Sequence, residues 1–203
     1  MSGRLHPLTE PRRAGHEGGR PGEWSRIQAL HAVSERHRRS HGCEAYTYSD
    51  GASLVVLSAA MHALRVLEFG TALGYTACCL AHGSARGHVD TVEFDAAHVA
   101  LARENIKNLG FQNRITVHEG EFVAVAQTFS ADYDLAFFDG FAPTLPQFQC
   151  MERLLRPGGM LITTNLQLGG DAALWRQLLS DERRWMTSDM AEGGRTAVSI
   201  KTG

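Results

Sequence analysis

Acidic and amide side chains stand at or just after the ends of five short apolar runs in this sequence. Glu68, Glu93 and Asp139 lie at the ends of the first, second and fourth runs, and Glu121 and Asn165 follow the third and fifth. The carboxyl ends of parallel strands meet at one edge of an open α/β sheet, where such folds bind ligands. The pattern therefore predicts one site with several carboxylates, suited to a cation or to hydroxyl groups.

A glycine-containing turn from Gly70 to Gly74 follows the first run. A dinucleotide-binding turn requires Gly-x-Gly-x-x-Gly, so that bare backbone approaches a pyrophosphate at a helix N-terminus. Here position 72 is alanine and Glu68 adds negative charge, and both features disfavour a pyrophosphate. A ligand with an ammonium group, a ribose and a cationic centre fits better, and S-adenosylmethionine has all three. We expect Glu93, roughly 20 residues after the turn, to accept hydrogen bonds from both ribose hydroxyls.

The elements that position these residues alternate between strand and helix. Strands are predicted over residues 65–69, 88–93, 114–118, 133–138 and 160–163. Helices are predicted over 24–39 and 51–62, from residue 75, over 95–109 and over 143–155. This alternation indicates a doubly wound α/β fold with a mostly parallel sheet. The segments 184–187 and 196–200, joined by a turn-rich stretch, add a C-terminal antiparallel hairpin and make the sheet seven-stranded.

Composition indicates one globular domain, predicted over residues 24–203, after a proline- and glycine-rich flexible tail over residues 1–23. The net charge of −2 gives no indication of a nucleic-acid partner. No stretch has the apolar length of a membrane span or of a secretory signal, which predicts a cytoplasmic protein. The cysteines show no Cys-x-x-Cys spacing and are interpreted as structural thiols rather than a zinc or redox site. They are Cys43, Cys78, Cys79 and Cys150.

Three motifs between about Tyr46 and Lys201 resemble the class I S-adenosylmethionine-dependent methyltransferases. Residues 67–76, LEFGTALGYT, resemble the motif L-E-I-G-x-x-x-G-Y-S of the small O-methyltransferases of the catechol and caffeoyl-CoA type. Gly51 stands 17 residues before Glu68, as the helix glycine of that family does. Residues 92–95 resemble its I-D-x-D ribose element, and the segment 156–159, RPGG, is similar to its turn before the fifth strand. The resemblance implies the Rossmann-like methyltransferase fold.

The resemblance also implies which residues contact S-adenosylmethionine and its product S-adenosylhomocysteine. These residues are Tyr46, Glu68, Gly70, Gly74, Tyr75, Thr76, Glu93, Gly120, Glu121, Phe122 and Asp139. For Glu121 two interpretations stay open, since its carboxylate could meet the adenine edge or cap the following helix.

Two departures from the family concern its divalent cation and its lysine. Family members hold the cation with an Asp after the fourth strand and an Asp-Asn pair after the fifth, where this sequence has Asp139 and the pair Thr164 and Asn165. With one carboxylate missing, no metal site is predicted, and these three residues are weak candidates only. The lysine that helps deprotonate the acceptor in the family falls at Ala142. Asp139 is therefore the predicted general base, and Asn165 is expected to orient the acceptor.

The predicted function is S-adenosylmethionine-dependent O-methylation of a small-molecule hydroxyl, with reduced or absent dependence on divalent metal. Alternatives are methylation of nitrogen or of a macromolecule by the same fold, and a protein that binds the donor without catalysis. A nicotinamide-dependent oxidoreductase is disfavoured by the missing middle glycine. The segment between Asn165 and Asp181 is short for the family, which predicts a more open acceptor pocket. A homodimer is expected from the family and from apolar faces on the early helices and the final hairpin.

Overall fold

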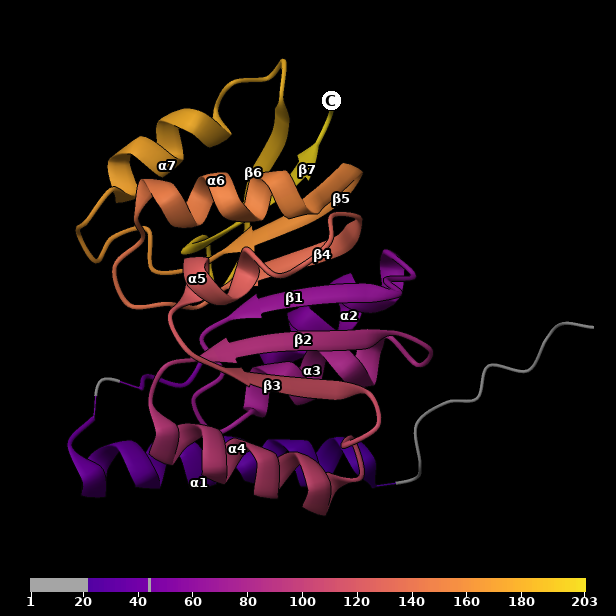
Figure 1. Ribbon diagram of the computed structural model, residues 1–203, viewed down its shortest axis with the longest axis vertical. Helices are drawn as coiled ribbons and strands as arrows, with labels where there is room; N and C mark the ends of the chain where they lie inside the picture. Colours follow the sequence, from indigo (N-terminus) through magenta and orange to yellow (C-terminus); the bar gives the residue numbers. More distant parts are fainter. Residues whose placement is uncertain (1–21, 44) are drawn as a thin grey trace, which may run out of the picture.

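The computed structural model describes residues 22–43 and 45–203 of the chain. The predicted tail over residues 1–23 lies outside the described residues as far as residue 21; from Glu23 the chain is already helical. Within the described residues, one sheet holds seven strands in the order β3-β2-β1-β4-β5-β7-β6 (Figure 1). The strands are β1 (Arg65–Phe69), β2 (His88–Glu93), β3 (Ile115–Glu119), β4 (Tyr133–Phe138), β5 (Leu155–Thr163), β6 (Trp185–Ala191) and β7 (Thr196–Lys201).

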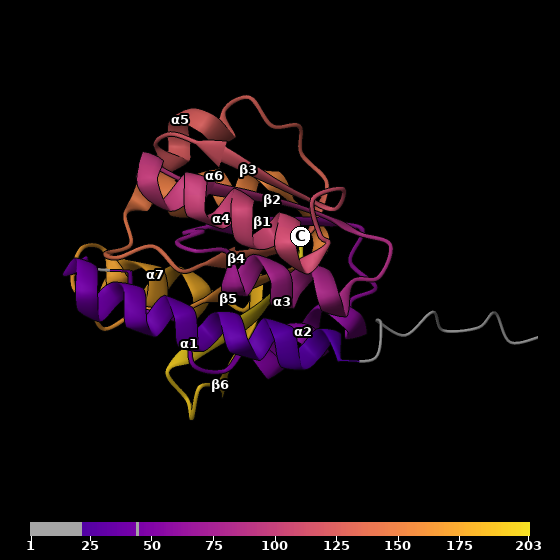
Figure 2. The same cartoon turned by 90° about the horizontal axis from the view of Figure 1, so that it is seen from below.

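Helices cover both faces of this sheet. They are α1 (Glu23–His41), α2 (Gly51–Ala60), α3 (Tyr75–Gly83), α4 (Ala96–Leu109), α5 (Phe122–Ala126), α6 (Leu145–Leu154) and α7 (Ala172–Leu179). Alternate residues of a strand point to opposite faces, so neighbouring residues enter different cores. In β4, Phe137 packs with residues of α1 to α4, whereas Phe138 packs with residues of α6 and α7. Figures 1 and 2 show the two helical layers on either side of the sheet.

The topology confirms the predicted fold class. Strands β1 to β5 run parallel, and β7 lies antiparallel between β5 and β6, as the predicted C-terminal hairpin requires. The predicted helix ends are within about two residues of those observed at α1, α2 and α6, which is the usual uncertainty of a helix boundary.

Two local predictions were wrong or incomplete. The segment 156–159 is no separate turn before the fifth strand but an irregular stretch within β5, with a register shift against Tyr133 and Leu135 of β4. Gly158 adopts a left-handed φ of 72° there, which lets the strand bulge and continue. Helix α7 was not predicted at all, although Trp175 and Leu179, four residues apart, are its buried face. None of the helices in the described part of the chain is long and apolar enough to cross a membrane.

Candidate functional site

The predicted site residues gather where β1, β2, β4 and β5 end. The backbones of Gly70 and Asp139 are in contact at the centre of this edge: Asp139 N donates to the carbonyl of Phe69 at 2.9 Å. A Cβ atom on Gly70 would lie 2.6 Å from the carbonyl oxygen of Asp139, and Gly70 has a φ of 103°. Only glycine fits that position, because any side chain would both strain the backbone and overlap the end of β4.

Glu68 is a fully buried carboxylate directly before this glycine. Its Oε2 accepts a hydrogen bond of 2.5 Å from Thr91 Oγ1, whereas its buried Oε1 has no partner within the described residues. Burial raises the pKa of Glu68 to about 7, Glu93 adds to the rise, and hydrogen bonds from Thr76 and Thr91 oppose it. A buried acceptor without a donor costs free energy, so this oxygen is suited to a cationic or N–H-bearing ligand group.

Glu93 ends β2 with its carboxylate already bound to backbone. Its Oε2 accepts from Ala72 N at 2.9 Å, and its Oε1 accepts from Phe94 N and Asp95 N at 3.0 Å each. Ala72 has a left-handed φ of 43°, so Glu93 holds the glycine turn in a conformation that alanine rarely adopts. A carboxylate offers about four lone-pair sites, and three are in use. About one lone-pair site of Glu93 therefore stays free, and the binding of ribose hydroxyls by Glu93 stays a prediction.

The residues after the turn begin α3, and their side chains point in two directions, towards Glu68 and towards α2. Gly74 is the N-cap of α3 in the left-handed region, with a φ of 88°. Thr76 is buried beside Glu68. The Tyr75 side chain lies against α2, where a Cβ on Gly51 would meet its hydroxyl at 2.2 Å. Gly51 and Tyr75 thus pack α2 onto α3 behind the turn.

Beyond β3, the predicted adenine-side segment forms the start of α5. Glu121 is the N-cap of α5, and its carboxylate accepts a hydrogen bond from Ala124 N at 2.9 Å. Of the two interpretations of Glu121, a helix cap or a contact with adenine, the structure shows the helix cap. Gly120 has a φ of 144°, and the Phe122 ring stacks on Phe69 with centroids 5.0 Å apart. Contact of this segment with a nucleobase stays a prediction.

A narrow cleft joins the glycine turn to the loop that follows α1. Tyr46 is 61% exposed at its rim, and the Arg38 guanidinium lies 4.3 Å from the centre of its ring. Burial raises the pKa of Tyr48 to about 12, so its hydroxyl stays protonated at neutral pH. The cleft is lined by Ser34, Tyr46, Thr47, Tyr48, Gly70, Thr71, Ala72, Leu73, Tyr75, Thr76 and Asp139.

Asp139 is the acid that faces this cleft. Its Oδ1 accepts a weak hydrogen bond of 3.3 Å from Asn165 Nδ2, which also donates to the carbonyl of Gly140 at 2.8 Å. Burial raises the pKa of Asp139 well above its usual value, with Glu68 and Glu192 adding to the rise. Asn165 has a left-handed φ of 63°, a conformation that asparagine tolerates, and this places its amide beside Asp139.

Glu192 belongs to the same edge of the sheet and was missed by the sequence analysis. Its Oε1 accepts a hydrogen bond of 2.6 Å from Ser49 Oγ, and its Oε2 accepts one of 2.9 Å from Thr196 Oγ1 and a weak one of 3.4 Å from Thr164 Oγ1. It thereby ties the turn between β6 and β7 to the loop after α1. The sequence carries no signal for this role beyond an acid in a glycine-rich turn, since the contact spans 143 positions.

The residues at the ends of β4 and β5 do not fit a hard divalent cation. Such a cation prefers an octahedron of oxygen ligands that includes carboxylates. Asp139 supplies one carboxylate, whereas Asn165 turns its amide nitrogen towards it, and both oxygens of the nearby Glu192 are held by hydroxyls. Thr164 contributes only a hydroxyl, which donates to Glu192.

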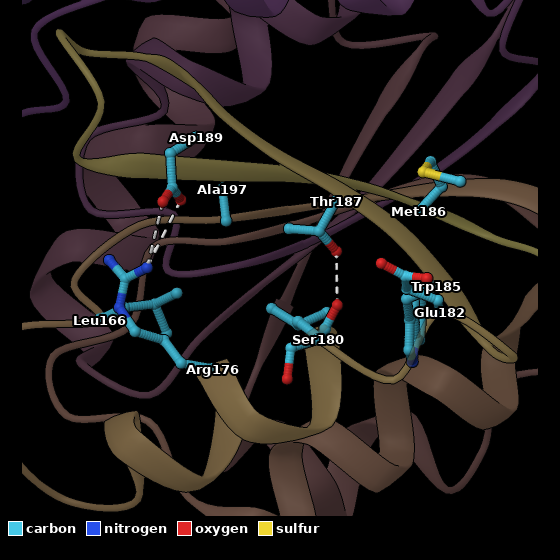
Figure 3. Close-up of a pocket in the computed structure, with 10 residues that line it drawn as sticks. Leu166, Arg176, Ser180, Glu182, Trp185, Met186, Thr187, Asp189 and Ala197 are labelled. Carbon is cyan, nitrogen blue, oxygen red and sulfur yellow. Dashed lines mark hydrogen bonds and ion pairs between the residues drawn. The ribbon is translucent and has the colours of Figure 1, made fainter.

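A larger hollow, of about 310 Å³, lies away from this edge, between α7 and β6. Figure 3 shows Arg176 facing Asp189 across it, with a 3.4 Å ion pair, and Thr187 Oγ1 donates to the carbonyl of Leu179 at 2.7 Å. The charged groups of Arg176 and Asp189 are thus paired with each other. None of the predicted site residues lines this hollow.

Comparisons with known proteins point to one family. A family model described as a methyltransferase domain matches residues 67–165. A catechol O-methyltransferase of Mycobacterium tuberculosis is 32% identical over 129 residues, which cover 62% of this chain and 59% of that protein. A protein of Mycobacterium sp. (strain JLS) assigned as an O-methyltransferase is 31% identical over 148 residues, which cover 71% of this chain and 67% of that one.

Solved structures agree on the fold. An O-methyltransferase from Bacillus cereus, crystallised in complex with S-adenosylhomocysteine, superposes with a TM-score of 0.72 at 23% identity, covering 88% of this chain and 91% of that one. The chain spans less than two thirds of the length of the two catechol O-methyltransferases it matches, 59% of one and 56% of the other.

Proposed function

This chain belongs to the class I S-adenosylmethionine-dependent O-methyltransferases, and we propose from that premise that it transfers a methyl group from S-adenosylmethionine to an oxygen of a small molecule. The observation that carries the proposal is the juxtaposition of Glu68, with its unpartnered Oε1, and Asp139 across Gly70. Glu68, which is suited to bind a cationic donor, and Asp139, which is suited to remove a proton, are thus linked through the backbone contact at Gly70.

The donor side fits S-adenosylmethionine in its chemistry. The free Oε1 of Glu68 would receive a positively charged or N–H-bearing part of the donor, and the remaining lone pair of Glu93 would receive one ribose hydroxyl. Gly70 and Asp139 both line the cleft, so a donor bound there would lie against the ends of β1 and β4. Phe94, which follows Glu93 and is 72% exposed, offers an apolar surface beside the ribose position.

On the acceptor side, Asp139 takes up the proton. The acceptor oxygen forms a bond to the methyl carbon as the carbon–sulfur bond breaks, S-adenosylhomocysteine leaves, and the hydroxyl proton passes to Asp139. The raised pKa of Asp139 makes its carboxylate a stronger base than an exposed aspartate. Tyr48 remains protonated, so it can orient but not deprotonate an acceptor. Holding donor and acceptor at near-attack distance supplies much of the remaining rate.

An aromatic hydroxyl compound is the acceptor class that we propose. Two aromatic side chains are exposed on the loops of this edge: Tyr46, which lines the cleft with Asp139, is 61% exposed, and Phe141, two residues after Asp139 in the chain, is 60% exposed. Exposed aromatic residues next to a cleft favour stacking with a flat apolar ligand. Catechol O-methyltransferases among the relatives support the same class.

Turnover with S-adenosylmethionine and a panel of phenols, catechols and hydroxylated acids, read by mass spectrometry, tests the proposal. A product 14 mass units heavier, whose yield falls in Asp139→Asn, is the expected result. Donor binding in calorimetry without any product would favour a protein that binds the donor without catalysis, and methyl transfer to amines alone would favour the nitrogen methyltransferase alternative. Absence of donor binding by the folded protein would overturn the proposal as a whole.

We also propose that the protein pairs into a homodimer. Met186 and Met190 of the edge strand β6 are each 63% exposed, and Val56 of α2 is 64% exposed. An edge strand with apolar side chains is prone to pairing. Light scattering should give twice the chain mass at micromolar concentration, and a monomer would overturn this proposal.

The predicted cytoplasmic location stays a prediction from the sequence.

A further inference from the structure

Three histidines and a cysteine meet between the end of α1 and the start of α4. His37 and His41 lie four residues apart and so share one face of the last turns of α1. Gly42 then adopts a left-handed φ of 69° and ends the helix, which brings Cys43 next to them. His98, in the first turn of α4, completes the group and is 6% exposed. In Figure 1 these ends of α1 and α4 lie on the side to which β1 and β2 point.

The ligand atoms of these four residues are close enough to share one ion. The nitrogen and sulfur atoms all lie within 4.8 Å of one another, and His37 Nε2 is 3.3 Å from His98 Nε2. Zinc–nitrogen bonds of about 2.0–2.1 Å in a tetrahedron separate two nitrogens by about 3.3–3.4 Å. The spacing is therefore that of two imidazoles on one tetrahedral metal. No other group of this kind occurs among residues 22–43 and 45–203.

We propose that His37, His41, Cys43 and His98 form a structural zinc site. Three imidazoles and one thiolate are a ligand set that selects zinc or another borderline-soft ion over Mg²⁺ or Ca²⁺, which prefer oxygen. Because the protein supplies all four ligands, no position stays open for a substrate, and the role is structural rather than catalytic. The proposal does not depend on methyl transfer.

The position of the zinc site in the fold indicates its structural role. An ion there would join the end of α1 to α4, two helices from distant parts of the chain. Arg38, next to His37, stacks on Tyr46, which lies at the rim of the donor cleft. Zinc would therefore fix the end of α1 and, through Arg38, the loop that forms one wall of the cleft.

Titration of the metal-stripped, untagged full chain with Co²⁺ and then Zn²⁺ tests the site. We expect one ion per chain, the intense visible bands of tetrahedral Co²⁺ and a thiolate-to-cobalt charge-transfer band, all displaced by Zn²⁺. Zinc at a thousandfold excess over its dissociation constant should raise Tm by about 5–15 °C. Cys43→Ser should remove the charge-transfer band, and Cys43→Ser, His41→Ala and His98→Ala should each weaken zinc binding by about tenfold or more.

Matched controls separate this cluster from other ligands in the chain. Cys150→Ser removes a thiol and His62→Asn an exposed imidazole, both outside the cluster, and neither should change the spectrum or the affinity. His41 is exposed, so His41→Ala tests the site without loss of a buried side chain even if His98→Ala fails to fold. Absence of stoichiometric binding, or binding unchanged in Cys43→Ser and His41→Ala, would overturn the proposal. The 3.3 Å contact would then be an N–H···N hydrogen bond between the two imidazoles.

Discussion

At the ends of β1 and β2, backbone geometry fixes the site: Gly70 touches the end of β4, and Glu93 binds three backbone N–H groups around the turn. At the ends of β4 and β5, the side chains of Asp139 and Asn165 define the site, and neighbouring residues differ from the family that the sequence resembles. Thr164 stands where that family has a metal-binding Asp, and Ala142 where it has a lysine. The comparison suggests that the donor side tolerates little change because a substitution disturbs the backbone, whereas the acceptor side can acquire different chemistry.

The largest effect that we expect is on the acceptor side, from Asp139→Asn. Loss of a general base costs about 10²–10⁴-fold in rate, and the amide keeps the size of the side chain. Donor affinity should stay within about threefold, because the carboxylates proposed to bind the donor are Glu68 and Glu93, and the amide of Asn keeps the shape of the Asp139 side chain. Steady-state kinetics and calorimetry measure the two quantities separately. If Asp139→Asn lowered donor affinity as much as kcat, Asp139 would bind the donor. The donor side and the acceptor side of the site would then not be separate.

On the donor side, Glu93→Gln should weaken S-adenosylmethionine binding by about ten- to a hundredfold, the value of hydrogen bonds to a charged group. Turnover at saturating donor should change little. Glu119→Gln is the matched control, since Glu119 pairs with Glu93 in the β2–β3 register but is exposed. Equal effects of the two substitutions would show that overall charge, and not the hydrogen bonds of Glu93, governs donor affinity.

The raised pKa of Glu68 makes the donor side sensitive to pH. With a pKa of about 7, Glu68 is about one tenth ionised at pH 6, so donor binding that requires the carboxylate should be about tenfold weaker at pH 6 than at pH 8. Glu68→Gln should remove this difference, and it also corrects for any titration of the donor itself. Calorimetry at the two pH values measures it. A pH dependence that persists in the variant would assign it to another group.

The same group affects stability in the opposite direction. Glu68 ionises near pH 4.5 when unfolded but near pH 7 when folded, so the folded state holds more protons between these values. The free energy of unfolding should therefore fall as the pH rises from about 4.5 to 7 and then level off, as far as Glu68 determines it. In Glu68→Gln this part of the fall should be absent from denaturation curves.

The fold could be predicted from the sequence because it follows local patterns, and the residues proposed for the donor side were found in the same way. Alternating strands and helices define the sheet, and Glu68, Gly70 and Glu93 lie at fixed distances within one strand–helix–strand unit. Glu192 was missed because its contacts with Ser49 and Thr164 arise only from the folding of the last hairpin over the sheet. The cysteine spacing does not indicate the cluster, because the cluster combines one cysteine with histidines, in the pattern His37-x₃-His41-x-Cys43 and the distant His98. Neither tertiary contact is encoded in a short motif.

The smallest effect that we expect is that of Mg²⁺ on turnover, and it tests whether the acceptor side works without the divalent cation of the family that the sequence resembles. Asp139 is the one carboxylate free to bind an ion there, and the amide nitrogen of Asn165 faces it, so added Mg²⁺ or Mn²⁺ should change the rate of metal-stripped protein by less than about twofold. These ions prefer oxygen and should leave the His/Cys cluster unoccupied, which keeps the two sites separable.

Thr164→Asp introduces the carboxylate that the family has at this position, and it tests metal binding at the acceptor side more directly. It should increase Mn²⁺ affinity at Asp139, seen in calorimetry, because two carboxylates attract a hard cation that one cannot hold. It should not raise kcat, since Ala142 still stands where the family that the sequence resembles has a lysine, and Glu192 would then face a new negative charge. Turnover that requires Mg²⁺ in the wild type, and rises further in Thr164→Asp, would mean that the acceptor side kept the metal after losing one ligand.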